Sequence, residues 1–446
     1  MSESKFNQIA DTIEARIDQG DYPINFKLPP HRALADELST TPATVAKAYK
    51  LLADKGRVES FVGRGTFVCG DTSLTQAIQP QDDQKEFNFS ILQPCLQNNI
   101  PSLKAAMMNV SAELTADSIG YAEHSGHHAH REAGVAWARA FGLKGGNANN
   151  TLLTHGAQHG LSLLIHALTE PGESIAVEAL TYPGILAIAS LSGRQVVSVA
   201  MDQQGLMADE LEQAIAQHDI KAVITLPSHQ NPTGITMPIS RRQEIAKVIN
   251  DNEIWLIEDD IYGFLNQRPL PAISNYAPDY AFHLSGLSKA ISPALRCGFM
   301  KVPESQVGVI SAHIRANIWL SSPINYMAAS HLITSGEAFK ISATQRDIAD
   351  RRQRIARDIL ADVQCTASGY HLWLPLPAGW APERFIIEAK DRGLIVSSGS
   401  YFDASGQGTR HIRLSLMSIT EEGRFRQGLS QLKVLLDSPM SAAFPM

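Results

Sequence analysis

The sequence lacks the features of a membrane-spanning or secreted protein. No uninterrupted apolar run among its 446 residues approaches the roughly eighteen residues needed to cross a bilayer. The first residues, MSESKFNQIAD, show neither a basic stretch followed by an apolar block nor a small-residue cleavage site. We therefore expect no membrane span, no secretory signal and a cytoplasmic location.

Cysteine is scarce, and its four residues never form a CxxC pair. They are Cys69, Cys95, Cys297 and Cys365. This spacing argues against a disulfide framework and against a zinc site, so we expect reduced thiols. Convincing internal repeats and low-complexity tracts are absent as well.

An excess of positive charge is also missing, because the formal net charge is -7. Nucleic-acid binding requires local rather than global positive charge, so this balance does not decide the matter. Residues 1–70 carry as many acidic as basic side chains, and any DNA-binding face there must segregate them. The length of the chain predicts two or three folding units.

The first seventy residues contain the pattern of a small helical domain. Apolar residues recur at helical spacing from Phe6 to Ile17, and a short second helix is expected at 34–38. Pro42, preceded by hydroxyl residues, is well placed to open a third helix that ends near Gly56. Residues 57–61 and 66–68 then flank Gly63-Arg64-Gly65 as a hairpin. Three helices and a hairpin predict a winged helix-turn-helix at 1–70.

The remainder predicts a linker followed by an α/β domain. Residues 71–85 are polar and lack a sustained apolar period, as expected of a linker. From Thr151, strand-like runs alternate with helical stretches, which favours a layered α/β fold with a mostly parallel central sheet. We expect this domain to span 86–446, with a smaller α+β lobe mainly at 340–446.

The N-terminal pattern alone fits either a DNA-binding domain or a structural or partner-binding appendage. The stretches QIADTIEARIDQGDY, LPPHRALADEL, TVAKAYKLL and VGRGTFV resemble the winged helix of the GntR family. The resemblance implies binding to double-stranded DNA through Arg32, Thr41, Thr44, Lys47, Arg64 and Gly65. Pro42 stands where the family usually has an arginine, so one phosphate contact is expected to be missing.

Lys289, in SGLSKAISPALRCG, carries the strongest chemical signal in the second domain. A lysine amine can hold an aldehyde cofactor, and Arg296 seven residues later can pair with a phosphate. A single lysine is usually a solvated surface charge, so this interpretation depends on other segments. Asp259 ends the apolar strand EIWLIEDD, and its buried carboxylate requires a partner such as a protonated pyridine nitrogen.

Further polar residues follow other predicted strands in the same order along the chain. Asn231 lies in the turn NPTG, and Tyr262 follows Asp259 by three residues; both can reach a phenolate oxygen. Gly156, Ala157 and Gln158 offer backbone amides at a helix N-terminus, which is a natural phosphate seat. Tyr182 can stack on a ring. Each feature alone fits an ordinary turn or strand-end cap, but their ordered occurrence favours one site.

From about Phe87 to its end, the chain resembles the fold-type I pyridoxal-phosphate (PLP) aminotransferases. The resemblance implies that Lys289 forms the internal aldimine and that Asp259 pairs with the pyridine nitrogen. Asn231 and Tyr262 would hold the phenolate, whereas Arg296 and the turn at 156–158 would hold the phosphate. Ser285 or Ser288 would assist, although Gly286 occupies the position where the family usually has a hydroxyl.

Two further family segments extend this comparison. Tyr121, Gly126 and Arg131 match a Y-x4-G-x4-R segment whose tyrosine reaches the phosphate of the partner subunit, which implies a homodimer. Arg413 matches the arginine that clamps the α-carboxylate of an amino acid.

The histidine cluster within the first segment prompts the question of a metal site. Because His124, His127, His128 and His130 fill variable positions of that segment, we expect no metal.

The two resemblances in this order describe the MocR subgroup of GntR regulators. They imply a PLP-dependent, DNA-binding transcription regulator in which an amino acid or amine forms an external aldimine. Closure of the two lobes would then change how the winged helices bind DNA. The linker is long enough for the DNA-binding domain to rest on the partner subunit. The alternative is an active aminotransferase of the class I/II type with a fused helical domain.

Overall fold

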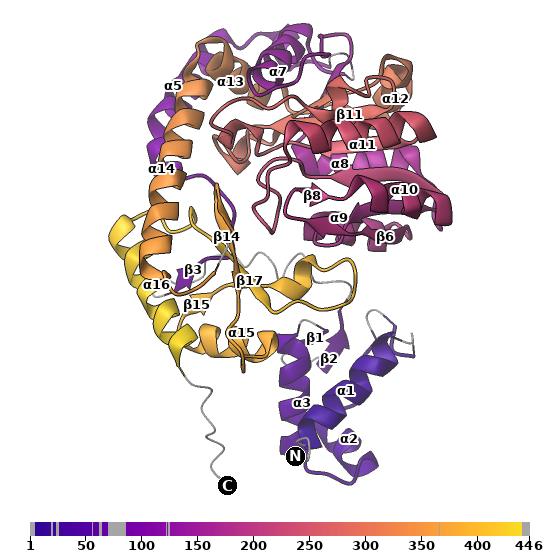
Figure 1. Cartoon of the computed structure of the whole chain (residues 1–446), viewed down its shortest axis with the longest axis vertical. Helices are drawn as coiled ribbons and strands as arrows, with labels where there is room; N and C mark the ends of the chain where they lie inside the picture. Colours follow the sequence, from indigo (N-terminus) through magenta and orange to yellow (C-terminus); the bar gives the residue numbers. More distant parts are fainter. Residues whose placement is uncertain are drawn as a thin grey trace. The chain divides into compact units, whose positions relative to one another are not determined.

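The structure is a computed structural model that describes residues 5–18, 21–23, 26–55, 57–61, 65–69, 86–121, 123, 125–364 and 366–438. The chain forms two compact units, residues 1–78 and 79–446 (Figure 1). The expected linker at 71–85 lies outside the described residues. Among the residues that are described, no helix is long and apolar enough to span a membrane.

The first unit contains three helices and a two-stranded antiparallel hairpin. Its elements are α1 (Lys5–Asp18), α2 (His31–Glu37), α3 (Pro42–Asp54), β1 (Val58–Phe61) and β2 (Gly65–Val68). The apolar stripes of α1 and α3 pack against each other through Ile13, Val45 and Leu52, all of which are buried. Pro42 occupies the first turn of α3, and Thr41 caps it. The predicted winged helix-turn-helix is confirmed.

The second unit is built around a seven-stranded sheet. In spatial order its strands are β4 (Thr151–His155), β12 (Cys297–Lys301), β11 (Ala281–Gly286), β10 (Trp255–Asp259), β9 (Ile220–Thr225), β5 (Ser174–Glu178) and β6 (Gln195–Val199). Strand β12 is antiparallel to both of its neighbours, whereas the other pairs are parallel. The predicted mostly parallel α/β sheet is confirmed, with β12 as an addition that the sequence pattern did not reveal.

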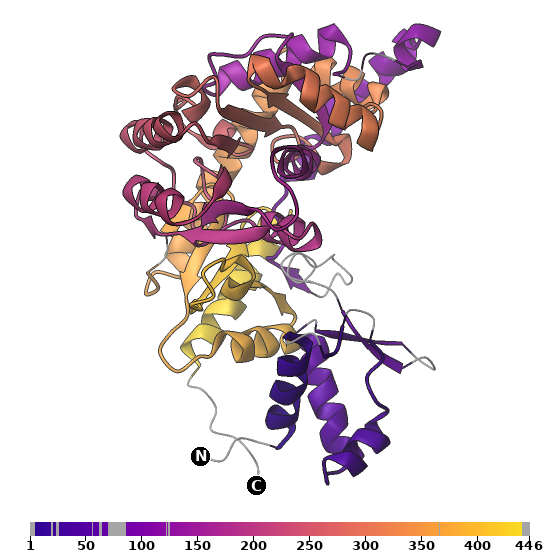
Figure 2. The same cartoon turned by 90° about the vertical axis from the view of Figure 1, so that its right-hand side faces the viewer.

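Helices cover both faces of this sheet (Figure 2). One face packs on α8 (Ala157–Leu168), α9 (Pro183–Leu191) and α12 (Val307–Asn317), and the other on α10 (Ala208–Gln217) and α11 (Ile239–Asn252). Successive residues of β9 contribute to opposite cores: Val223 belongs to one, and Ala222 and Ile224 to the other. A strand buried on both faces reads as a continuous apolar run, which explains its sequence.

A third helical layer and short elements complete the large lobe. The helices are α5 (Ile100–Glu113), α6 (Ala116–Ile119), α7 (His128–Ala140) and α13 (Pro323–Thr334). The 3-10 turns are η1 (Leu96–Asn98), η2 (Gly263–Leu265), η3 (Ile273–Asn275), η4 (Pro293–Leu295) and η5 (Glu304–Gln306), and β7 (Met201–Asp202) pairs with β8 (Gly205–Leu206). Helices α5, α7 and α13 share a core with the start of α14.

The long helix α14 (Glu337–Ile359) leads from the large lobe to the small one (Figure 1). The small lobe has an antiparallel sheet in the order β13-β14-β17-β16. Its elements are β13 (Thr366–Ser368), β14 (His371–Pro375), α15 (Pro382–Asp391), β15 (Leu394–Ile395), β16 (Ser397–Ser398), η6 (Gly399–Phe402), β17 (His411–Ser415) and α16 (Glu422–Asp437). Residues of β14, α15, β15, β17 and α16 form one apolar core.

The beginning of the second unit belongs to the small lobe. Strand β3 (Phe87–Asn88) pairs in parallel with β15, and the side chains of Phe87 and Phe89 are buried in the small-lobe core. The guanidinium of Arg424 donates to the carbonyl of Glu86 at 2.9 Å. The small lobe therefore comprises residues near 86–90 as well as the predicted C-terminal segment.

Candidate cofactor site

The candidate site lies at the carboxyl edge of the large sheet. Parallel strands β9, β10 and β11 end at this edge, and the chain then continues to Asn231, Asp259 and Lys289. Because β12 runs in the opposite direction, it begins at the same edge and brings Arg296 there. In open α/β sheets the ends of the strands are where ligands bind. The topology thus gathers side chains that are far apart in the sequence.

Lys289 is a half-buried residue whose amine interacts electrostatically with three other predicted residues. Its Nζ donates to the carbonyl oxygen of Leu92 at 2.7 Å. The pKa of Lys289 is lowered to about 8, mainly by burial, with Arg413 and Arg296 adding to the effect and Asp259 opposing it. A substantial fraction of this amine is therefore neutral near physiological pH, and a neutral amine is the form that attacks a carbonyl.

Asp259 provides a test of whether a pyridine ring fits this site. Its side chain is only 2% exposed, and its Oδ1 accepts no hydrogen bond from the described residues. Burial raises the pKa of Asp259 to about 7. A buried carboxylate oxygen without a donor is costly, and a protonated ring nitrogen would supply that donor. The residue fits the group that the family resemblance implies.

The predicted phosphate seat is the N-terminus of α8. Gly156 caps this helix at φ +80°, and no side-chain cap bond is made there among the described residues, so N–H groups of the first turn can bind an anion. Arg296 donates to the carbonyl of His155 at 3.0 Å. A Cβ at position 156 would lie 2.7 Å from the Arg296 guanidinium, which explains the glycine. The Ser285 hydroxyl is buried and has no partner among the described residues.

Arg413 and Asn231 orient each other. Nη1 of Arg413 donates to Oδ1 of Asn231 at 3.0 Å, which leaves the Asn231 Nδ2 as a donor for another acceptor such as a phenolate. Nη2 of Arg413 contacts the carbonyl of Ser90 and the Ser397 hydroxyl. Burial lowers the pKa of Arg413 to about 10, so an anionic ligand such as a carboxylate would offset the cost of burying this cation.

Two tyrosines line the same region. Burial raises the pKa of Tyr182 to about 12, with the Asp259 carboxylate adding to the effect. Tyr262 is fully buried with a raised pKa, and Arg413 acts on it in the opposite direction. Both phenols are therefore neutral donors at physiological pH, as hydrogen bonding to an anionic oxygen requires.

For several predicted residues, the described part of the single chain shows no hydrogen bond or ion pair to this cluster. Tyr121 is 87% exposed and packs edge-on against Trp319. Arg131 donates to the carbonyl of Ala148 at 2.7 Å and pairs with Glu123 at 2.9 Å, so it stabilises the fold locally. Gly126 adopts φ +93°. The position of Ser288 is half-buried, and no described contact to its hydroxyl suggests a role.

The predicted DNA-binding residues lie on the first unit. Arg32, Lys47 and Thr41 are exposed. The Thr41 hydroxyl accepts from the Thr44 backbone N–H at 3.2 Å and lies 2.8 Å from the Thr44 hydroxyl, so both threonines already stabilise the start of α3. Gly65 adopts φ +113°. Arg64 lies outside the described residues.

The histidine segment is partly described. His124 lies outside the described residues, and His128 pairs with Glu132 at 3.7 Å on the surface. Nδ1 of His130 lies 2.7 Å from the Ser330 hydroxyl, and burial lowers the pKa of His130 to about 4. In the described part of the chain, no three histidine, cysteine or acidic residues group as metal ligands.

Sequence reasoning missed a buried network beneath Asn231. Glu178, at the end of β5, accepts from the Thr225 hydroxyl at 2.8 Å and from Nε2 of Gln230 at 3.0 Å. Burial raises the pKa of Glu178 to about 7. His371 of the small lobe bonds to the Gln230 carbonyl at 3.0 Å. A carboxylate at the end of an apolar strand was the only available signal, and the same signal had identified Asp259.

Tyr326 was also missed, although it braces the phosphate seat. Its hydroxyl lies 2.7 Å from the Thr154 carbonyl and 2.6 Å from the Gly298 carbonyl, and it accepts from the Gly298 N–H. Gly298 permits the close approach of β12 to the start of α8. A Cβ there would lie 2.7 Å from the carbonyl carbon of Gly156 and 3.0 Å from the Ala157 nitrogen.

We therefore expect Gly298→Ala to displace the seat and weaken the retention of PLP by at least about tenfold, which corresponds to roughly 1.4 kcal/mol. Equilibrium dialysis of the purified protein against PLP would measure this retention. Gly308→Ala in α12 is the matched control, because nothing lies within 4 Å of the added Cβ. Equal retention by the two variants would contradict this account of the seat.

Comparisons with known proteins agree with this architecture. Residues 84–427 match the family model for aminotransferase class I and II, and residues 5–68 match bacterial regulatory proteins of the gntR family. In Bacillus subtilis, the protein named uncharacterized HTH-type transcriptional regulator YdeF is 28% identical over 97% of this chain and 94% of its own length. The HTH-type pyridoxine biosynthesis transcriptional regulator PdxR of Corynebacterium glutamicum is 28% identical over 80% of this chain and 79% of its own.

The solved structures support the same fold for the second unit. The α-aminoadipate aminotransferase LysN of Thermus thermophilus superposes with a TM-score of 0.73 at 20% identity, covering 86% of this chain and 96% of that one. The two family models together span most of the chain, and the aminotransferase class I and II model alone matches more than half of it. The chain belongs to the aminotransferase class I and II family and carries an N-terminal GntR-type helix-turn-helix domain.

Proposed function

We propose that this chain is a PLP-dependent transcription regulator that binds DNA and senses an amino acid or amine at the site around Lys289. The observation that carries the proposal is the presence of a GntR-type domain and an aminotransferase class I and II domain in one chain. Relatives matched along 94% and 79% of their own length are named transcriptional regulators. A regulator of chromosomal DNA would act in the cytoplasm.

The residues of the site would divide the work of holding PLP and its ligand. The turn at 156–158, Arg296 and Ser285 would bind the phosphate, and Asp259 would pair with the ring nitrogen. Asn231 and Tyr262 would hold the phenolate, with Tyr182 against the ring. Bound PLP supplies an aldehyde that condenses with primary amines. Arg413 would select ligands with a carboxylate, and Lys289 would hold the cofactor until an amine arrives.

The lowered pKa of Lys289 predicts how PLP attaches to the cofactor-free protein. The rate should rise with pH and level off above about 8, because the neutral amine is the attacking form. The growth of visible absorbance after mixing with PLP measures this rate, and Lys289→Ala should show none. Lysine acetylated on its α-amine serves as a control. Its rate of reaction with PLP should continue to rise until the pH reaches the ordinary pKa of the ε-amine, 10.5. A protein rate that follows the same course would contradict the effect of burial.

The exposed basic residues of the first unit predict salt-dependent DNA binding. Lys47→Ala on α3 should weaken binding and lower the slope of log affinity against log salt by about one unit, because one phosphate contact is lost. Fluorescence titration with fragments recovered from genome-wide binding sites would measure both. Lys104→Ala removes the same charge from an exposed position of α5 and should change neither. Identical slopes for the two variants would remove α3 from the DNA interface.

The buried guanidinium of Arg413 predicts which ligands are sensed. Amino acids should perturb the PLP absorbance at concentrations at least about tenfold lower than their decarboxylated amines, because only amino acids offer a carboxylate to pair with the cation. Arg413→Gln should abolish this preference. DNA affinity should change with the same midpoint as the absorbance. Sensing is refuted if the absorbance responds and DNA affinity does not.

A homodimer is part of the proposal. Several large apolar side chains are exposed near Tyr121, which the family places at the partner's phosphate. They are Met108, Leu114, Ile119, Trp319 and Ile324. Exposed apolar clusters of this kind favour an interface. A dimer would also allow the DNA-binding unit of one subunit to rest on the other.

Transamination is the second candidate function. It is favoured by the presence of both Lys289 as a base near the ring and Arg413 as a carboxylate-binding residue. Keto-acid formation, followed in the same titrations with amino acids, separates the candidates. Sustained turnover without any effect on DNA affinity would favour the enzyme, whereas a single partial turnover is compatible with regulation.

A further inference from the structure

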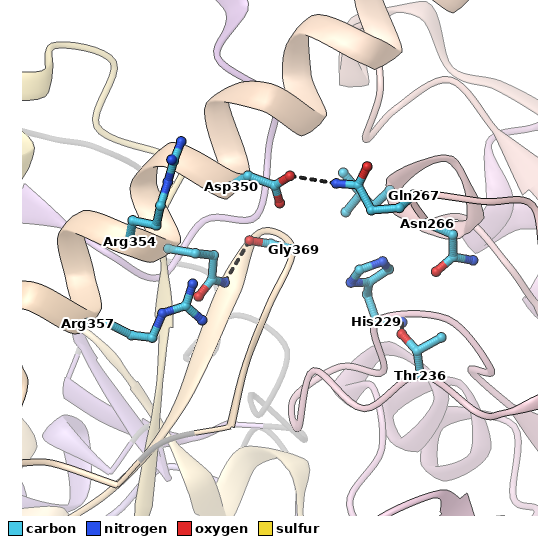
Figure 3. A pocket seen from close by; sticks show the side chains of 10 residues that line it. His229, Thr236, Asn266, Gln267, Asp350, Arg354, Arg357 and Gly369 are labelled. Atoms are coloured by element: carbon cyan, nitrogen blue, oxygen red, sulfur yellow. Dashed lines mark hydrogen bonds between the residues drawn. The ribbon is translucent and has the colours of Figure 1, made fainter.

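A cavity lies between the two lobes of the 79–446 unit, beside the turn that leads from β9 to Asn231. Its volume is about 560 Å³, enough for a small metabolite. On one side it is lined by Asp350, Gln353, Arg354 and Arg357 of α14. On the other side lie residues of the large lobe that include His229 (Figure 3).

Gln353 presents a buried acceptor at this cavity. Its Nε2 donates to the carbonyl oxygens of Gly369 at 2.8 Å and His371 at 3.1 Å. Because both partners are carbonyl oxygens, the amide nitrogen must be the atom that faces them. Oε1 therefore lies on the opposite side of the amide group. Oε1 has no hydrogen-bond partner among the described residues, although the side chain is only 3% exposed. A ligand that brings an N–H donor would satisfy it.

The charges of α14 complement a zwitterion. Asp350, Arg354 and Arg357 recur at intervals of four and three residues and therefore lie along one face of the helix (Figure 3). In the described part of the chain, neither arginine forms an ion pair or a hydrogen bond. The Asp350 carboxylate accepts one bond, from Gln267 at 2.7 Å, and retains capacity for a second donor. An anionic group thus fits near the arginines and a cationic group near Asp350 and Gln353.

The cavity is connected to the cofactor site through one short turn. His229 is two residues from Asn231, whose amide is bonded to Arg413. Gln353 bonds to the carbonyl of His371, and the ring of His371 bonds to the Gln230 carbonyl in the same turn. An occupant would therefore contact α14 on one side and the turn that supports the cofactor residues on the other.

We propose that this cavity is a second binding site, separate from the cofactor site, for a small amino-acid-like zwitterion. Arg354 and Arg357 bind its carboxylate, and Asp350 and the Gln353 Oε1 accept from its ammonium group. Binding is noncovalent, because these contacts are ion pairs and hydrogen bonds. The site does not depend on aldimine chemistry or DNA binding, so it can be tested independently of the proposed function.

A suitable probe is N,N-dimethylglycine with the PLP-loaded, full-length protein. This molecule has a carboxylate and an N–H donor, but as a tertiary amine it cannot condense with the aldehyde of PLP. We expect saturable binding in calorimetry or ligand-observed NMR. Acetate and trimethylamine, which each carry one of the two charges, should bind at least about tenfold more weakly.

Variants of α14 locate the probe. Arg354→Gln/Arg357→Gln should raise its dissociation constant at least about tenfold, and Asp350→Asn should raise it about fivefold, through lost charge-assisted bonds. Arg351→Gln removes a charge from the same helix at a residue that pairs with Glu422 and does not line the cavity, so it should have no effect. The absorbance of PLP in each variant checks that the cofactor site is intact.

Two results would overturn the second site. One is an unchanged dissociation constant in the double variant. The other is binding that is lost in Arg413→Gln but retained in the double variant, which would assign the probe to the cofactor site. If instead the cavity variants lose the probe while amino acids still shift the PLP absorbance, the second site stands whatever the fate of the sensing proposal.

Discussion

The second unit depends on the cost of burying charge at the carboxyl edge of its large sheet. Lys289, Asp259 and Glu178 lie at or just after the ends of its strands, and Arg413 reaches the same region from β17 of the small lobe. Asp259, Glu178 and Arg413 are buried, and Lys289 is half-buried. Removing such groups from water costs several kcal/mol each unless partners compensate. Glu178 and Arg413 have partners within the chain, whereas Asp259 retains an oxygen without one. This imbalance is what a bound cofactor would correct.

The same constraint explains what could be predicted from the sequence. Asp259 was recognisable because it ends an apolar strand with a charge, and such residues are rarely buried without a reason. Lys289 was recognisable from its spacing to Arg296 together with the ordered polar residues of the other segments. The strands β9, β10 and β11 were recognisable as continuous apolar runs, since they are buried on both faces. The three helices of the first unit followed from their periodic apolar stripes and from Pro42.

The residues that were missed share another property: their roles arise from contacts between distant segments. Tyr326 braces the phosphate seat from α13, and Ser90 contacts Arg413 across more than three hundred residues. Strand β12 was not identified, and its antiparallel pairing with β4 joins segments that lie far apart in the sequence, as in the pair Gly298 and Thr154. Local patterns report secondary structure and burial, but they do not report which segments meet. The cavity beside α14 belongs to the same category.

The pairing of β3 with β15 determines how a lobe movement would be transmitted. Phe87 and Phe89 are anchored in the small-lobe core, and they are among the first described residues after the 71–85 segment. The tether of the DNA-binding unit is therefore fastened to the small lobe and not to the large sheet. Any rotation of the small lobe would therefore move Phe87 and Phe89, and with them the start of the second unit. No pathway of contacts through the interior of the large lobe would be needed.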